Sequence, residues 1–122
     1  MSNPFADQER FMRACDQTVD WPNKDQFNMY LGLIEEEAEE LNDAIRNNDS
    51  VEALDALVDI LVVTIGAIHS MGADAEGAWN EVMRTNFAKI DPVTGKVRKR
   101  EDGKILKPES WSPPDLKPYV KK

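Results

Sequence analysis

The sequence predicts an all-α protein of four helices followed by an extended C-terminal arm. Apolar side chains recur every three or four residues over most of residues 5–90, which is the spacing of one helix face. Residues 91–122 hold five prolines and two glycines, so they cannot form a long helix. At 122 residues, the chain 1–122 is expected to be a single domain, with a core over about 5–90 and an irregular basic arm over about 91–122.

The first three helices are predicted in order along the chain. The first covers residues 5–19 and ends before Trp21-Pro22-Asn23-Lys24. The second runs from Tyr30 to Ile45, where apolar residues recur at steps of four, four, three and four. The polar stretch Asn47-Asn48-Asp49-Ser50 ends it, and its serine caps a third helix from Val51 to about His69. The second and third helices are therefore expected to form an αα-hairpin.

The fourth helix follows Met71-Gly72-Ala73-Asp74. In this stretch the glycine ends the third helix and the aspartate caps the fourth. Trp79 and Phe87 are among the apolar positions that the fourth helix is expected to bury, and it stops before Asp91-Pro92.

The charge of the chain is divided between an acidic body and a basic arm. The net charge is −8, but residues 1–83 carry −14 and residues 84–122 carry +6. The arm can contact phosphate or the acidic body, or it can be a solvated end. A short β-hairpin over Val97–Lys107 is compatible with the dipeptide Asp102-Gly103. Dedicated nucleic-acid binders usually have a dominant basic surface, so stable nucleic-acid binding is not expected.

Two acidic clusters lie on either side of the hairpin turn: Glu36-Glu37-x-x-Glu40 and Glu52-x-x-Asp55-x-x-x-Asp59. In a hairpin, residues equally far from the turn face each other, which places Glu40 opposite Asp55 and Glu36 opposite Asp59. Unit charges about 4 Å apart at a partly buried site repel by about 4 kcal/mol. A hard cation with oxygen ligands relieves this repulsion, so the clusters indicate a divalent-metal site.

Two other interpretations of these acids stay open. Acidic helix faces are often only solvated, and an acidic hairpin can instead bind a basic partner protein without catalysis. The third helix argues against both, because it is apolar nearly all round between Ala53 and Ile68. Such a helix is normally buried, and buried carboxylates need partners.

Other kinds of site are excluded by the residues present. The chain has no Cys/His cluster, no glycine-rich phosphate loop and no calcium-loop motif. His69 is the only histidine and is expected at a helix end, so catalysis would have to use metal-activated water. The longest apolar run, Ile60–Ile68, is far shorter than the about 20 residues of a membrane span. The single Cys15 and the N-terminus without a signal peptide suggest the cytoplasm.

The two acidic segments, Leu33–Ile45 and Asp55–Val63, resemble the E-E-x-x-E, spacer, E-x-x-D pattern of a known superfamily. This superfamily is the all-α nucleoside triphosphate pyrophosphohydrolases, which include the MazG-like proteins. The resemblance is strongest to small phage and bacterial members called phosphoribosyl-ATP pyrophosphohydrolase-like, whose later segments are similar to Val82–Ile90 and Asp102–Lys107.

The chain departs from this pattern at one position. Ala56 stands where the motif has a glutamate. Asp55, one residue earlier, or Glu52, one turn earlier, can supply the missing ligand, and the number of metal ions is left open.

The resemblance implies hydrolysis of a (deoxy)nucleoside triphosphate to the monophosphate and pyrophosphate, with phosphoribosyl-ATP as the alternative substrate. It implies Mg²⁺, with Mn²⁺ able to substitute, and Glu37 as the general base. The implied metal ligands are Glu36, Glu37, Glu40, Asp55, Asp59 and Glu52. The implied substrate contacts are Asn86, Lys89, Arg84, Lys104 and Lys107, while Trp21 can stack on a base or pack in the core or an interface.

The superfamily also implies the assembly. Its members are homodimers or homotetramers with sites built from neighbouring subunits, and a helix as apolar as the third needs such covering. A homo-oligomer without membrane contact is therefore expected, in the host cytoplasm if the protein is phage-encoded. The preferred base and sugar cannot be predicted from the residues.

Overall fold

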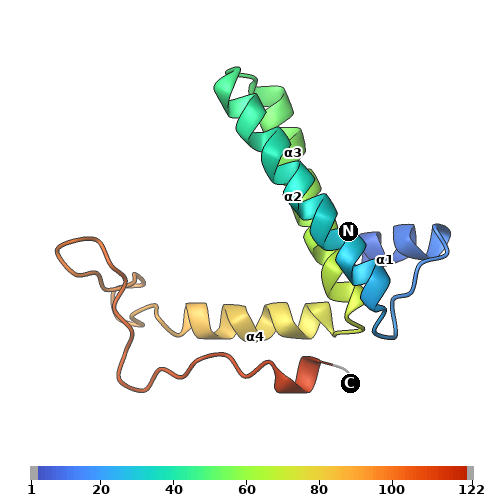
Figure 1. Cartoon of the computed structure of the whole chain (residues 1–122). Helices are drawn as coiled ribbons and strands as arrows, with labels where there is room; N and C mark the ends of the chain where they lie inside the picture. Colours follow the sequence, from blue (N-terminus) through green and yellow to red (C-terminus); the bar gives the residue numbers. More distant parts are fainter. Residues whose placement is uncertain (1–2, 121–122) are drawn as a thin grey trace. The chain divides into compact units, whose positions relative to one another are not determined.

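The computed structural model describes residues 3–120, and this part of the chain is all-α, as predicted (Figure 1). No strand forms among these residues, and none of their helices is long and apolar enough to cross a membrane. The elements are α1 (Pro4–Ala14), α2 (Lys24–Arg46), α3 (Ser50–Ser70), α4 (Ala75–Phe87) and the short 3-10 helix η1 (Lys117–Tyr119).

The described residues form two compact units. Residues 3–75 together with Val120 make up the N-terminal unit, and residues 76–119 make up the C-terminal unit. The division falls at the start of α4, so almost all of α4 groups with the arm. Folding of residues 1–122 as a single domain stays a prediction.

Helix α1 is shorter than the predicted helix over residues 5–19. It begins with Pro4, and the Asn3 side chain accepts hydrogen bonds from the backbone N–H groups of Phe5 and Ala6, so the N-terminus is capped. The helix ends at Ala14, and Asp16 takes a left-handed conformation with a φ of 58°. The buried Val19 contributes to the core from outside the helix, which explains the overestimate.

Helices α2 and α3 form the predicted antiparallel hairpin and run side by side along their length (Figure 1). Asn47 ends α2, and Asn48 turns the chain with a φ of 53°. The cap of α3 is Asp49, whose Oδ1 accepts from the N–H of Glu52 at 3.1 Å, and not Ser50, which is already helical. At the other end of α3, Gly72 has a φ of 71°, as predicted for the residue that ends this helix.

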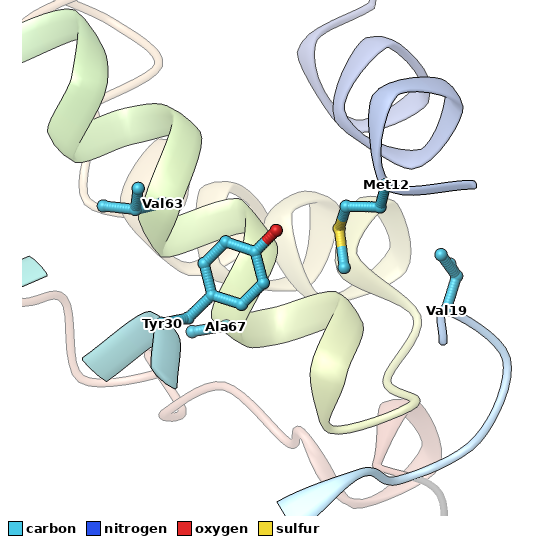
Figure 2. Packing of buried hydrophobic residues seen from close by; sticks show 5 residues of the cluster. All are labelled: Met12, Val19, Tyr30, Val63 and Ala67. Carbon is cyan, nitrogen blue, oxygen red and sulfur yellow. The ribbon is translucent and has the colours of Figure 1, made fainter. Parts of the chain in front are cut away.

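The hydrophobic core lies where α1 crosses the end of the hairpin farthest from its turn. Figure 2 shows the five side chains of this cluster, in which the Tyr30 ring of α2 lies against α3. The Tyr30 hydroxyl donates to Gln17 Oε1 at 2.5 Å, and Gln8 Nε2 donates to the same hydroxyl at 3.5 Å. The cluster consists of Met12, Val19, Tyr30, Val63 and Ala67.

His69 is a buried structural residue at the end of α3. Its Nε2 lies 2.9 Å from the backbone oxygen of Phe5. Because a carbonyl oxygen only accepts, Nε2 must carry a hydrogen and donate. The histidine therefore ties α1 to α3, in agreement with the expected position at a helix end.

One face of α3 is apolar and exposed in the single chain. The sequence predicted that this helix is buried, yet Leu54 and Leu61 are 64% and 63% exposed. We call this face the α3 stripe. It consists of Val51, Leu54, Leu57, Val58 and Leu61.

In the C-terminal unit, two long-range hydrogen bonds hold the arm along α4. The indole Nε1 of Trp111 donates to the backbone oxygen of Thr85 at 2.7 Å, and the N–H of Asp115 donates to Glu81 Oε2 at 2.7 Å. The chain doubles back at Asp102-Gly103, but its pairing is limited to isolated bridges, so the short β-hairpin does not form there as strands.

The expectation that α4 buries its large aromatic residues is wrong for this chain. Trp79 and Phe87 are both more than half exposed.

Replacing Gly66 tests the close contact between the hairpin helices. A Cβ at this position would overlap the Tyr30 ring, with Cδ1 and Cζ only 2.7 Å away. Gly66→Ala should therefore lower the free energy of unfolding by about 1–3 kcal/mol, measured by urea denaturation followed by circular dichroism. Gly32→Ala on α2 is the control, because apart from its chain neighbours and the backbone of its own helix no atom lies within 4 Å of the added Cβ. The control should raise stability by about 0.5–1 kcal/mol, and equal effects would contradict this packing.

Candidate active site

Four carboxylates interact across the hairpin: Glu37 and Glu40 from α2, and Asp55 and Asp59 from α3. We call them the acidic cluster. Burial raises the pKa of Glu37, and the negative charges of the other three carboxylates raise it further. Burial also raises the pKa of Asp59, and the charges of Asp55 and Glu40 add to this effect. The helices therefore hold four mutually repelling acids together, among them Glu40 and Asp55, which the spacing around the turn placed opposite each other.

No basic side chain neutralises this cluster among the residues that the structure describes. Arg46, which follows Glu40 on α2, pairs with Asp43, with Arg46 Nη1 lying 3.2 Å from Asp43 Oδ1. Arg13 pairs with Glu9 and Asp20. None of the ion pairs within residues 3–120 involves a carboxylate of the acidic cluster.

One carboxylate oxygen of the cluster is buried and lacks a hydrogen-bond partner. This atom is Oε2 of Glu37. A buried polar atom left without a partner costs roughly 1–3 kcal/mol, and more when it is charged. The cluster therefore holds an oxygen with unused capacity to accept a proton or bind a cation.

The composition of the cluster fits a hard divalent cation, because all four groups present carboxylate oxygens. Within residues 3–120, however, no group of three or more His, Cys, Asp and Glu side chains already converges as metal ligands. The carboxylates would have to turn toward a common point to hold an ion. Metal binding by this cluster stays a prediction.

The structure places Glu36 and Glu52 differently from the acidic cluster. Neither is among the charges that act on Glu37 or Asp59. From α2, the charge of Glu40 raises the pKa of Asp59. The charge of Asp59 in turn raises the pKa of Glu37. Glu36 and Glu37 are adjacent on α2, so their side chains differ by about 100° in direction, which is consistent with only Glu37 joining the cluster.

The structure also bears on the departure at position 56. Ala56 is buried, with 2% of its surface exposed, while its neighbour Asp55 belongs to the acidic cluster. Asp55 is therefore better placed than Glu52 to replace the glutamate of the motif.

The predicted substrate residues fall in both units. Trp21 belongs to the N-terminal unit and is 72% exposed, so packing in the core of this chain is excluded for it. In the C-terminal unit, Lys89 Nζ donates to Asn86 Oδ1 at 3.2 Å, which joins two of the predicted residues. Lys104 and Lys107 are exposed on the arm.

Arg84, another predicted substrate residue, already has a carboxylate partner. Its Nε and Nη2 donate to the two carboxylate oxygens of Glu81 at 2.7 and 3.0 Å. These two hydrogen bonds from Arg84, together with the hydrogen bond from the N–H of Asp115, lower the pKa of Glu81 to about 2. Arg84 would have to leave Glu81 to reach a phosphate, so it is a weaker candidate than Lys89.

Two residues of the C-terminal unit were missed by the sequence analysis. The Trp111 ring lies beneath two lysines, with Lys107 Nζ 4.3 Å and Lys89 Nζ 5.4 Å from its centroid. Arg98 lines a pocket together with these lysines. The positive charge of residues 84–122 was the only sequence signal for this group, because its members are far apart in the chain.

The chain that carries this hairpin and acidic cluster belongs to a known class of proteins. The chain belongs to the MazG-like all-α nucleoside triphosphate pyrophosphohydrolase superfamily, as the family match over residues 8–86 shows. The pattern of the phosphoribosyl-ATP pyrophosphohydrolase family matches residues 8–86, about two thirds of the sequence, and the chain belongs to this family. The family acts on a phosphoanhydride bond of a nucleotide-like substrate. No curated protein matches the chain at a significant level.

The ion pair of Glu81 predicts a pH dependence of stability. The pKa of Glu81 is about 2 in the folded protein and 4.5 without these interactions. The carboxylate therefore stabilises the fold above about pH 4.5, and this contribution is lost as the pH falls from 4.5 toward 2. Glu81→Gln should lower the thermal midpoint near neutral pH, and the difference from the unchanged protein should shrink through this window. Glu101→Gln, at an exposed residue of the arm, is the control. A constant difference at all pH values would contradict the assignment.

Proposed function

We propose that this protein hydrolyses a nucleoside triphosphate to the monophosphate and pyrophosphate, using Mg²⁺ held by the acidic cluster. The observation that carries this proposal is the group of four unneutralised carboxylates with the unpartnered Oε2 of Glu37. Membership of a pyrophosphohydrolase family supports the reaction class. The bond broken, the metal and the substrate are parts of the proposal.

The ligands proposed for the ion are Glu37, Glu40, Asp55 and Asp59, with Glu36 and Glu52 as outer candidates. Bound Mg²⁺ would supply positive charge to the phosphate oxygens and lower the pKa of a bound water. Mn²⁺ offers the same preference for oxygen ligands and is expected to substitute.

Glu37 is the best candidate for the general base. Its pKa is raised by burial and by the neighbouring carboxylates, so its carboxylate is a stronger proton acceptor than an ordinary glutamate. The unpartnered Oε2 is the atom that would accept the proton of the attacking water. Glu40, Asp55 and Asp59 would keep this carboxylate basic through their charges.

The C-terminal unit supplies the cations proposed to contact the phosphates. Lys89 is the first candidate, and Asn86, which holds its ammonium group, would orient it. Arg84, Lys104 and Lys107 are further candidates, and the exposed Trp21 ring is proposed to stack on a base.

Phosphoribosyl-ATP, the substrate that gives the family its description, is the second candidate substrate. It contains the same triphosphate chain as a nucleoside triphosphate. A carboxylate cluster acts on that shared chain, so none of its contacts favours one substrate over the other.

We further propose that the protein is a homodimer or homotetramer in which the α3 stripe is covered by another copy. Exposed apolar surface of this kind normally marks an interaction site. The stripe follows helical spacing along α3, so it matches the apolar face of a helix from a second chain.

The products distinguish this reaction from other phosphate chemistry. If water attacks the α-phosphorus, the bond to the bridging oxygen breaks, and monophosphate and pyrophosphate should form in equal amounts without diphosphate. A panel of nucleoside triphosphates and phosphoribosyl-ATP, analysed by ion-exchange chromatography, measures the products and identifies the substrate.

Removing divalent ions should abolish turnover, and Mg²⁺ should restore it. Orthophosphate as the first product would overturn the reaction, and no turnover with any substrate would favour a non-catalytic acidic protein.

Substitutions in the acidic cluster separate a functional site from a structural one. Glu40→Gln and Asp55→Asn each remove one repelling charge while keeping the side-chain shape. Both should abolish most turnover, yet leave the metal-free protein equally stable or more stable by about 0.5–2 kcal/mol, as when a strained functional site is relaxed. Thermal melts beside the activity assay measure both effects.

Glu39→Gln is the matched control for these variants, because Glu39 is an exposed residue beside Glu40 on α2. It should leave turnover within about twofold of the unchanged protein, well under 1 kcal/mol in the barrier. Clear destabilisation by Glu40→Gln and Asp55→Asn with turnover retained would show that the cluster is structural.

A further inference from the structure

The C-terminal unit contains a basic pocket between the end of α4 and the arm. Its volume is about 290 Å³. Three cationic side chains line it, Lys89, Arg98 and Lys107, while Asp91 is the only acidic residue in its wall. The pocket is therefore positive within a protein whose net charge is −8.

None of the three cations has a carboxylate partner among the residues that the structure describes. Other arginines of the same unit do have one, since Arg84 pairs with Glu81 and Arg100 pairs with Asp102. Asp91 is engaged within its own turn, because its Oδ1 accepts from the N–H groups of Val93 at 2.8 Å and Thr94 at 3.4 Å. With three cations and one carboxylate in its wall, the pocket keeps a net positive charge.

Trp111 holds two of these cations near each other. Both ammonium groups lie over its ring, 4.3 Å from the centroid for Lys107 and 5.4 Å for Lys89. A hydrogen bond holds the ring in place: its Nε1 donates to the backbone oxygen of Thr85, a buried residue, at 2.7 Å. An aromatic face attracts an ammonium group without neutralising its charge. Trp111 is thus a positioning residue that keeps the lysines close while leaving them able to bind an anion.

Backbone hydrogen bonds join the walls of the pocket. The N–H of Leu106 donates to the backbone oxygen of Arg98 at 2.8 Å. The N–H of Asp91 donates to the backbone oxygen of Lys96, also at 2.8 Å. Arg98 and Lys107 are therefore brought to the same pocket by pairing within the arm, although they are nine positions apart in the sequence.

We propose that this pocket binds a phosphoanhydride group of pyrophosphate size, through Lys89, Arg98 and Lys107 and without a metal ion. Arginine and lysine are the usual partners of phosphate oxygens. A volume of about 290 Å³ lies just below the about 300–1,000 Å³ of small-molecule sites, which suits a short anion better than a whole nucleotide. The proposal rests on the proposed function only for the choice of ligand.

Calorimetric titration of the full chain with inorganic pyrophosphate tests this pocket. The buffer is passed over a chelating resin, so that neither divalent ions nor an anionic chelator is present. Saturable binding at one site per chain is expected. Arg98→Gln and Lys107→Gln should each weaken this binding by about fivefold or more, since one charge contact is worth at least that factor.

Two controls keep the result specific. Lys96→Gln removes an exposed positive charge of the same arm that does not line the pocket, and it should change the affinity by less than about twofold. Trp111→Leu should weaken binding as much as Lys107→Gln, while Trp111→Phe, which keeps an aromatic face but not the Nε1 donor, should weaken it less than Trp111→Leu. Thermal melts report whether each variant is folded.

The outcomes separate this pocket from the proposed reaction. A nucleoside triphosphate in the same metal-free buffer should compete with pyrophosphate if its phosphate chain uses the pocket, and a lack of competition would restrict the ligand to free pyrophosphate. Absence of pyrophosphate binding, or equal affinity of the folded Arg98→Gln, Lys107→Gln and Lys96→Gln variants, would overturn the proposal. Failure of the proposed function would appear differently, as intact pyrophosphate binding in a protein that hydrolyses no substrate.

Discussion

The register between α2 and α3 is the constraint on which the candidate active site depends. It is set at one end by the tight turn at Asn48 and the Asp49 cap, and at the other end by the contact between Gly66 and the Tyr30 ring. Side chains on a helix turn by about 100° per residue, so a slip of one position would point the carboxylates in different directions. The packing at both ends of the hairpin therefore decides which acids meet in its middle.

The hairpin combines two features that do not favour its own stability. The acidic cluster repels itself and leaves Oε2 of Glu37 without a partner, and the α3 stripe exposes apolar surface. Binding of the proposed cation would relieve the first feature, and contact with the proposed second copy would relieve the second. Ligands that bind only the folded state stabilise it by mass action, so both kinds of binding would act on the same two helices.

The sequence predicted those features that depend on local pattern. The helical spacing and the polar turn at Asn47-Asn48 gave the hairpin, and counting from that turn brought Glu40 and Asp55 together. The same counting paired Glu36 with Asp59, because it ignores the direction of each side chain, and the structure brings Glu37 into the cluster instead. The arrangement around Trp111 could not be predicted, because its contact with Thr85 joins residues 26 positions apart in an irregular segment. Such contacts depend on the path of the arm and leave no periodic signal.

The uneven charge of the chain has opposite consequences for the two kinds of binding surface. In the proposed homo-oligomer, a second copy on the α3 stripe would bring another strongly acidic body with it, since residues 1–83 carry a net charge of −14. Dissolved salt screens that repulsion, so it should promote association of the apolar faces. The same screening weakens the attraction between the basic pocket of the arm and an anion. Higher ionic strength would therefore favour association of the chain with further copies, and lower ionic strength would favour binding of a phosphate ligand.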